Sequence, residues 1–218
     1  MLNSKEHGFY RYTPAKDLYF AKNINLIPVT VSEVKKLCCE YPIVIVMEEE
    51  TPRLVLLSGL KENMAIDEKG VWKGTYVPSF LKRYPFTLMR SESDDTTAHI
   101  GFDLESGLFS SPEGEPLFNP DGTPSEILEN INTFLAAFQK ENQLTTNILL
   151  RLKEEGLIEA AQLTYTDENG EEQKVGGFAI ISKEKLFETD DAFLLEAVRN
   201  GWMEMIELHN LSLAKIKV

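Results

Sequence analysis

The sequence predicts an α+β fold: a mixed, largely antiparallel sheet with hairpins, packed against several helices, plus a loop-rich lobe. Three observations predict it. β-rich runs stand in pairs around short turn sequences, apolar residues recur elsewhere at helical spacing, and strands do not alternate regularly with helices as in a wound parallel sheet. With 218 residues, 43% of them hydrophobic, the chain is long enough for a single domain over residues 1–218 with a sizeable core.

The N-terminal third is expected to contain an irregular arm, three strands and a helix. The arm covers residues 1–19, where polar and aromatic residues follow no period. Ser32 is the predicted N-cap of the helix, and Pro42 follows its expected end at Glu40. β-rich runs mark the strands, the last two forming a hairpin around "EEETP": residues 25–30, 43–47 and 53–58.

The middle of the chain combines a second pair of strands with the loop-rich lobe. The strands are expected at residues 86–91 and 98–104, joined by the acidic loop "ESDDTT". The lobe covers residues 105–124, where glycines and prolines recur every few positions. Within it, "NPDG" at residues 119–122 is a turn sequence. The alternative, a calcium loop, lacks the alternating oxygen ligands that such a loop needs.

Two consecutive helices are expected after this lobe. The first has Thr123 as its N-cap and Pro124 in its first turn. Its apolar stripe breaks near Asn142, and a second helix continues from there to Gly156.

The C-terminal part is expected to begin with a hairpin around Asn169–Gly170. The glycine pair in "VGGF" indicates a bulge in its second strand. A short helix near residues 183–188 follows. Asp190 or Asp191 then caps a helix that stops at Gly201. The last helix places one face toward the core: Trp202, Ile206, His209, Leu213 and Ile216.

Charge and cysteine content exclude several classes of function. The 22 basic and 35 acidic residues leave a net charge of −13, which argues against binding nucleic acid or an anionic membrane. No apolar run approaches the ~20 residues of a membrane span, and the N-terminus lacks the apolar region of a signal peptide. The two cysteines, Cys38 and Cys39, are adjacent, so we expect buried thiols in a cytoplasmic protein rather than a disulfide framework.

No motif for catalysis, metal or cofactor binding is present. The chain has no Walker loop, dinucleotide fingerprint, zinc signature or nucleophile elbow. His99 and Asp103 would share one face of a strand but stand about 13 Å apart. His209 lies on the apolar stripe of the last helix, which is typical of a core or interface histidine. The sequence therefore identifies no cofactor, no metal site and no catalytic residue.

The stretch "GVWKGTYVPSFLKRYPF", residues 70–86, stands out. Residues 69–91 carry five positive charges and no negative one, so the rest of the chain carries −18 (−13 minus 5). Interleaved aromatic and basic residues could stack on a ligand ring while Arg83 or Lys82 holds a carboxylate or phosphate. The alternative is packing: Pro78 starts a short helix, Phe80 and its neighbours face the core, and a second proline ends the helix.

This stretch also resembles the central signature of the SapC family. The matching residues are Gly70, Trp72, Tyr76, Pro78, Arg83, Tyr84, Pro85 and Phe86. Further matches follow in order over roughly residues 20–218: "PLFNPDGTPS", the "EEGLIE" helix end, "VGGFAII" and "HNLSLAKI". Lys82 stands where family members often carry arginine, which leaves open whether a bidentate contact is needed there.

The resemblance implies an association rather than a mechanism. The family takes its name from a gene in a bacterial surface-layer secretion locus, beside components of a type I export system. Its members are soluble, and no catalytic residues carry over from it.

Three functional hypotheses follow. The first is a cytoplasmic accessory protein that binds an exported or surface-layer protein or a secretion component through residues 69–91. The second is an enzyme that modifies a peptide or small molecule in a pocket lined by residues 70–86. The third is an oligomerisation module, which predicts an apolar surface patch and a homo-oligomer. The candidate binding residues are Trp72, Tyr76, Lys82, Arg83, Tyr84, Asp103 and His209.

Overall fold

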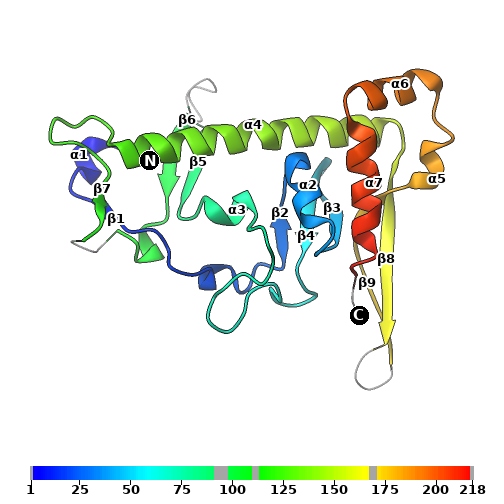
Figure 1. The fold of residues 1–218 in the computed structure, drawn as a ribbon, viewed down its shortest axis with the longest axis horizontal. Coiled ribbons are helices and arrows are strands. Elements are labelled where there is room, and N and C mark those ends of the chain that lie inside the picture. The colour runs from blue at the N-terminus through cyan, green and yellow to red at the C-terminus, as the bar shows by residue number, and fades with distance from the viewer. Residues whose placement is uncertain (1, 91–97, 110–112, 167–170, 217–218) are drawn as a thin grey trace. The chain divides into compact units, whose positions relative to one another are not determined.

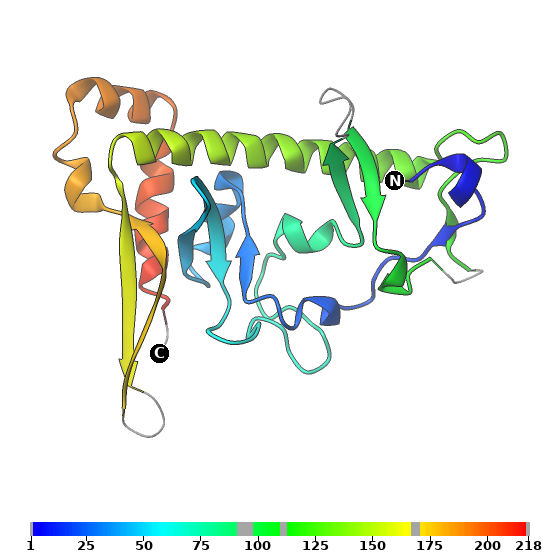
Figure 2. The same ribbon diagram turned by 180° about the vertical axis from the view of Figure 1, so that it is seen from behind.

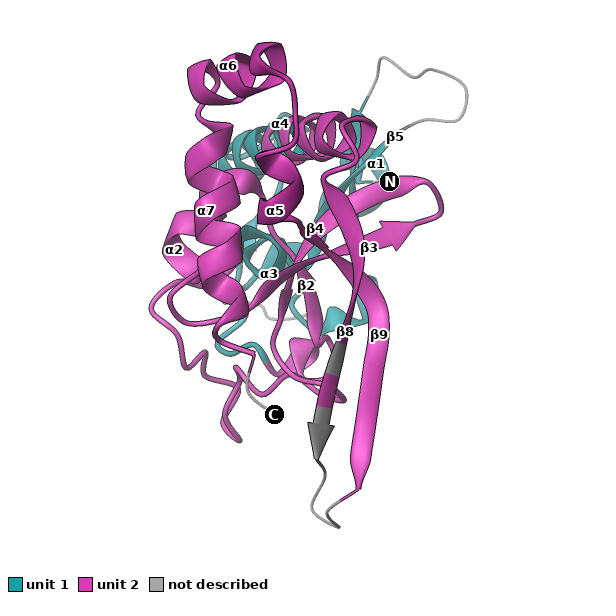
Figure 3. Ribbon diagram, turned by 90° about the vertical axis from the view of Figure 1, so that its right-hand side faces the viewer, with its two compact units in different colours: residues 1–18, 79–140 teal, residues 19–78, 141–218 magenta. Residues whose placement is uncertain are grey.

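The computed structural model describes residues 2–90, 98–109, 113–166 and 171–216 of the chain. The predicted α+β class is confirmed: helices accompany antiparallel strand pairs. The chain divides into two compact units, coloured separately in Figure 3. Unit 1 comprises residues 1–18 and 79–140, and unit 2 comprises residues 19–78 and 141–218. Each unit therefore combines segments that are distant in the sequence.

Unit 2 is built on a five-stranded antiparallel sheet with the strand order β2-β4-β3-β9-β8. Both predicted hairpins are confirmed, β3 with β4 and β8 with β9, and the second extends as a long ribbon (Figures 1 and 2). The Asn169–Gly170 turn itself lies outside the described residues. The strands are β2 (Leu26–Pro28), β3 (Ile43–Glu48), β4 (Thr51–Leu57), β8 (Ile158–Thr166) and β9 (Glu172–Ile181).

The glycine pair of β9 forms the predicted bulge. Ala161 pairs with Phe178 but Leu163 pairs with Val175, so the register shifts at Gly176 and Gly177. Gly177 has a φ of +88°, a conformation that residues with a Cβ rarely adopt. This glycine is explained by backbone shape, as the sequence suggested.

Within the described residues of unit 2, four α-helices and the second half of a longer helix accompany the sheet. α7 packs against β3 and β9 and lies beside α2, while α6 packs on α7. The predicted cap at Asp190 and stop at Gly201 are confirmed, since the Asp190 carboxylate accepts from the Phe193 N–H at 2.8 Å. The helices are α2 (Val31–Leu37), α5 (Lys183–Leu186), α6 (Asp191–Arg199) and α7 (Trp202–Leu213), and a 3-10 turn, η1, covers Tyr19–Ala21.

The predicted N-cap of α2 was wrong by two residues. The cap is Thr30, whose backbone N–H donates to the Glu33 carboxylate at 2.9 Å. This is half of a capping box, and the spacing T-x-x-E was its signal in the sequence. The adjacent cysteines at the end of α2 are free, and Cys38 is buried as expected, whereas Cys39 is exposed. The expectation of two buried thiols is therefore wrong for Cys39.

In its described residues, unit 1 contains two small antiparallel sheets, β1 with β7 and β5 with β6. The predicted strands after Pro85 and from Ala98 are confirmed, while the "ESDDTT" loop between them lies outside the described residues. The expected N-terminal arm includes two short elements. The elements of unit 1 are α1 (Ser4–His7), β1 (Arg11–Tyr12), α3 (Ser79–Lys82), β5 (Phe86–Arg90), β6 (Ala98–Phe102), η2 (Leu104–Ser106) and β7 (Glu115–Pro116).

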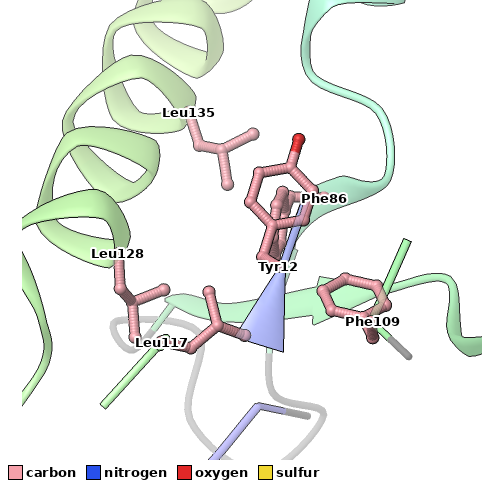
Figure 4. Close-up of a cluster of buried hydrophobic side chains, with 6 residues drawn as sticks. All are labelled: Tyr12, Phe86, Phe109, Leu117, Leu128 and Leu135. Atoms are coloured by element: carbon pink, nitrogen blue, oxygen red, sulfur yellow. The ribbon is translucent and has the colours of Figure 1, made fainter. Parts of the chain in front are cut away.

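The core of unit 1 is an aromatic and leucine cluster (Figure 4). Three rings from separate segments meet there: the Tyr12 ring lies 4.9 Å from Phe86 and 5.7 Å from Phe109, centroid to centroid. Leucines from the long helix and the loop-rich lobe close the cluster. Its buried members are Tyr12, Phe86, Phe109, Leu117, Leu128 and Leu135.

One long helix, α4 (Glu126–Glu154), replaces the two helices that we predicted. The chain between the two apolar stripes is rich in alanine, glutamine, glutamate and lysine and has no glycine or proline, so nothing interrupts the helix. Its start was also misplaced: the Thr123 hydroxyl and N–H both donate to the Asp121 carboxylate, which forms the "NPDG" turn instead of a cap. The left-handed Gly156 (φ +71°) follows its end.

The cap of α6 gives a first testable expectation. Replacing Asp190 with alanine leaves the Phe193 N–H without its side-chain acceptor, so we expect a loss of about 1 kcal/mol in the free energy of unfolding. Urea denaturation of the whole chain measures it. Asp190→Asn keeps an oxygen acceptor and should lose far less; an equal loss in both variants would contradict capping as the cause.

Candidate binding site around Arg83

The local chain path around α3 brings basic and aromatic side chains together. The Arg83 N–H donates to the Ser79 carbonyl at 3.1 Å, which completes one helical turn, and the Phe86 N–H donates to the Arg83 carbonyl at 2.7 Å. The Tyr84–Pro85 peptide bond is cis. Pro78 precedes the helix and Phe86 opens β5, as the packing interpretation predicted. The backbone of this turn thus places three consecutive side chains, residues 82–84, beside the core of unit 1.

A pocket of about 320 Å³ opens next to these side chains within unit 1. One wall carries the predicted residues Lys82, Arg83 and Tyr84, and the opposite wall is one face of α4 with the side chains of Asn130 and Phe134. Its apolar lining overlaps the aromatic cluster of Figure 4, since Tyr12 and other cluster members contribute to both. The pocket therefore joins a small apolar cavity to two cationic side chains.

Arg83 is the unusual member of this pocket. Its Nη1 donates to the Thr87 hydroxyl at 2.6 Å, and its guanidinium carbon lies 4.4 Å from the centre of the Phe80 ring. Its Nε is buried and has no hydrogen-bond partner in the part of the chain that the structure describes. Among the residues that the structure describes, no carboxylate forms an ion pair with Arg83. The side-chain contacts of this half-buried cation are thus a hydroxyl and an aromatic ring, with no carboxylate among the described residues to balance its charge.

Burial lowers the pKa of Arg83, because desolvation disfavours the charged guanidinium. Arginine nevertheless stays protonated at any physiological pH. An uncompensated charge at the edge of an apolar cavity creates a positive potential, and the low local dielectric strengthens its attraction for an anion. The pocket is thus suited chemically to a carboxylate or phosphate carried on an apolar or aromatic group.

Tyr84 and Asp103 are brought together, as candidate residues of one site would be. The Tyr84 hydroxyl donates to the Asp103 carboxylate at 2.9 Å. Burial and this partner raise the pKa of Tyr84 to about 12, so the phenol stays neutral. Asp103 also caps η2 by accepting from the Glu105 N–H at 3.0 Å. The Asp103 carboxylate therefore stabilises the local chain by accepting hydrogen bonds from Tyr84 and from the backbone of η2.

Trp72 and Tyr76, in contrast, belong to unit 2. The Trp72 side chain is 8% exposed, and its ring lies 5.3 Å from that of Tyr41. The Tyr76 hydroxyl donates to the buried Glu33 carboxylate at 3.0 Å, and Lys36 lies over the Tyr76 ring. These contacts attach the segment to α2, so the aromatic residues of the stretch "GVWKGTYVPSFLKRYPF" are divided between the two units.

His209 is a fully buried residue of unit 2. Its Nε2 accepts from the Ile181 N–H of β9 at 3.1 Å. The neutral ring must therefore carry its proton on Nδ1, which finds no acceptor in the described part of the chain. Burial lowers the pKa of His209 to about 4. The structure thus brings Lys82, Arg83 and Tyr84 to one pocket, with Asp103 hydrogen-bonded to Tyr84, but places His209 inside the core of the other unit.

Sequence reasoning missed the residues that complete the pocket. Thr87 stands four residues after Arg83 and is its hydrogen-bond partner. Ile127, Asn130 and Phe134 come from α4, where spacings of three and four place them on one helical face. That stripe was recognised as apolar, but nothing in the sequence showed that it would face residues 82–84.

The whole sequence can be compared with models of known protein families. A family model for SapC matches residues 2–218, essentially the whole chain. The chain belongs to the SapC family. The resemblance to the SapC family is thereby confirmed, and the 70–86 stretch contributes four residues to the pocket around Arg83: Lys82, Arg83, Tyr84 and Phe86. No curated protein and no solved structure gives a significant match.

In the four described ranges, no group of three or more histidine, cysteine, aspartate or glutamate side chains is arranged to hold a metal ion. None of the helices in those same ranges combines the length and apolar character needed to cross a membrane.

Proposed function

We propose that this SapC-family chain is a cytoplasmic accessory protein that binds an acidic segment of an exported or surface-layer protein, or of a secretion component. The contact surface is the Arg83 pocket of unit 1. The observation that carries the proposal is the half-buried Arg83 guanidinium without an ion-pair partner among the described residues, at the edge of an apolar pocket. Family membership supports the link to surface-layer export.

The energetics favour a binding role for Arg83 over a structural one. A buried charge without a counterion costs free energy, and a fold that only needed packing would gain by an apolar side chain there. Phe86 and Leu135 already supply the core beside it. Residues that cost stability in this way are typical of functional sites. An incoming carboxylate would compensate the charge of Arg83, and exposed Lys82 adds a second positive charge at the same pocket.

Trp72 and Tyr76 stay outside the proposed contact. Both side chains are engaged within unit 2, Trp72 with Tyr41 and Tyr76 with Glu33. We therefore narrow the predicted 69–91 surface to residues 79–86 with their neighbours on α4.

The test is Arg83→Met, which removes the charge and keeps a long apolar side chain. We expect capture of the partner from a lysate of the native host to fall at least tenfold, the equivalent of about 1.4 kcal/mol. Because an uncompensated buried charge disappears, the melting temperature should stay unchanged or rise. Quantitative mass spectrometry of the captured proteins and thermal denaturation of the variant measure the two effects.

Arg199→Met is the matched control, since Arg199 is an exposed arginine on α6 of unit 2. It should capture as much as the native chain. Arg83→Lys keeps the charge without the planar guanidinium and should retain part of the binding. Undiminished capture by Arg83→Met, or captured proteins unrelated to export or the surface layer, would contradict the proposal.

A further inference from the structure

A second and larger cleft, of about 640 Å³, lies entirely within unit 2. Four segments line it: residues 40–42 after α2, residues 57–62 and 64–65 from the end of β4 onward, Lys73, and residues 215–216 after α7. Its size is within the range of clefts that hold small molecules of about drug size, about 300–1,000 Å³. None of its lining residues belongs to the Arg83 pocket.

The loop that forms much of this cleft is held in place by hydrogen bonds from two asparagine side chains, one fully buried and one half-buried. Asn63, fully buried, donates to the Ala21 carbonyl at 3.1 Å and accepts from the Ala65 N–H at 3.1 Å. The Asn25 side chain donates to the carbonyls of Gly59 and Leu60 at 3.1 and 3.2 Å. A loop fixed by amide side chains on both sides presents a preformed wall, which reduces the entropy cost of binding a ligand.

The lining combines apolar walls with an excess of lysine. Pro42, Leu57, Leu60 and other apolar side chains form the walls, and the large side chain of Met64 is 65% exposed beside them. An exposed methionine next to an apolar cleft is typical of a surface that adapts to an apolar ligand.

Three lysines line the same cleft in a chain of net charge −13: Lys61, Lys73 and Lys215. Lys73 donates to the Met64 carbonyl at 2.8 Å. Lys61 and Lys215 form no ion pair with any residue in the described ranges. Opposing them are two carboxylates, Glu62 and Glu40.

The Glu40 carboxylate is already engaged. It accepts from the Thr75 N–H at 3.0 Å and from the Thr75 hydroxyl. Its position is constrained further by Gly74, where a Cβ would collide with the Glu40 carboxylate and the Tyr41 hydroxyl. Glu40 therefore anchors residues 74–75, and the cleft has more positive than negative charge available to a ligand.

We propose that this cleft is a second ligand site, which binds an amphipathic monocarboxylate of fatty-acid type. The aliphatic chain lies against Leu57, Leu60 and Met64, and the carboxylate is held by Lys61 and Lys215. Charge complementarity selects an anion, and the apolar walls select a ligand with an aliphatic body rather than a small inorganic ion.

Isothermal titration calorimetry of the full chain with decanoate, below its micelle concentration, tests the proposal. We expect saturable binding at one site. From hexanoate to octanoate to decanoate, the affinity should rise by up to about fourfold per added methylene, the value for full burial. 1-Decanol, with the same tail and no charge, should bind at least tenfold more weakly than decanoate.

The double variant Lys61→Met/Lys215→Met should weaken decanoate binding at least tenfold, because charge-assisted contacts are lost. Lys69→Met is the matched control, since Lys69 is exposed and does not line the cleft. It should bind decanoate as the native chain does. The proposal is overturned if decanoate does not bind, if decanol binds equally well, or if the double variant keeps full affinity. It is also overturned if decanoate fails to bind while a peptide with an apolar C-terminus binds in a way that depends on Lys61 and Lys215.

Discussion

Replacing Phe86 with alanine is expected to lower the free energy of unfolding by about 3–5 kcal/mol. Phe86 is 3% exposed and meets two rings edge to face, Tyr12 at 4.9 Å and Phe109 at 5.6 Å between centroids. Truncation to alanine loses the buried apolar contacts of the ring. It also leaves a cavity that the neighbouring rings are too rigid to fill. Because small proteins are stable by only about 5–15 kcal/mol, such a loss is a large share of the total.

Urea denaturation followed by circular dichroism measures this loss. Phe9→Ala is the matched control in the same unit, because Phe9 is 75% exposed and outside the cluster; it should change stability by less than about 1 kcal/mol. If Phe86→Ala costs no more than Phe9→Ala, the aromatic cluster is not the core that holds unit 1. Such a result would also remove the support that this cluster gives to the Arg83 pocket.

Local patterns in the sequence were enough to predict much of the fold. The β3–β4 hairpin follows from two β-rich runs around a short polar break, and α6 follows from Asp190 before an apolar stripe and Gly201 after it. In each case the determining residues are neighbours in the chain, so the interactions that they make could be anticipated.

The long helix α4 shows where local patterns mislead. Its buried apolar residues are Leu128 and Leu135 in unit 1, and Ile148, Leu149 and Leu152 in unit 2. The apolar stripe changes near Asn142 because the helix stops contributing to one core and begins contributing to another. In the sequence that change resembles a helix boundary, although glycine and proline, the residues that most often end helices, are missing there.

The candidate site was predictable only in part, for a similar reason. Residues 82–84 could be identified from their composition and their resemblance to a signature, and Tyr84 does meet Asp103. The face of α4 that completes the pocket, with Asn130, is more than 40 residues away in the sequence. Such a pairing depends on tertiary packing, which no period or spacing encodes.

The second large effect is a loss of stability at acidic pH, caused by the buried His209. Its pKa is lowered by burial to about 4, against an ordinary value of about 6.5. The unfolded chain therefore takes up a proton at a higher pH than the folded chain does. The resulting stability is fully present above pH 6.5 and is lost as the pH falls from 6.5 toward 4. The loss amounts to about 2 kcal/mol by pH 5 and approaches about 3 kcal/mol below pH 4.

His209→Gln isolates this contribution, because the Gln amide oxygen can accept from the Ile181 N–H yet does not titrate. We expect the difference in unfolding free energy between pH 7 and pH 5 to be about 2 kcal/mol smaller in this variant than in the native chain. Urea denaturation at both values measures it, and the other acidic groups cancel in the comparison. His209→Leu lacks the acceptor and should be destabilised at both pH values, with the same reduced slope. A Gln variant that keeps the native slope would show that the protonation of His209 does not control acid stability.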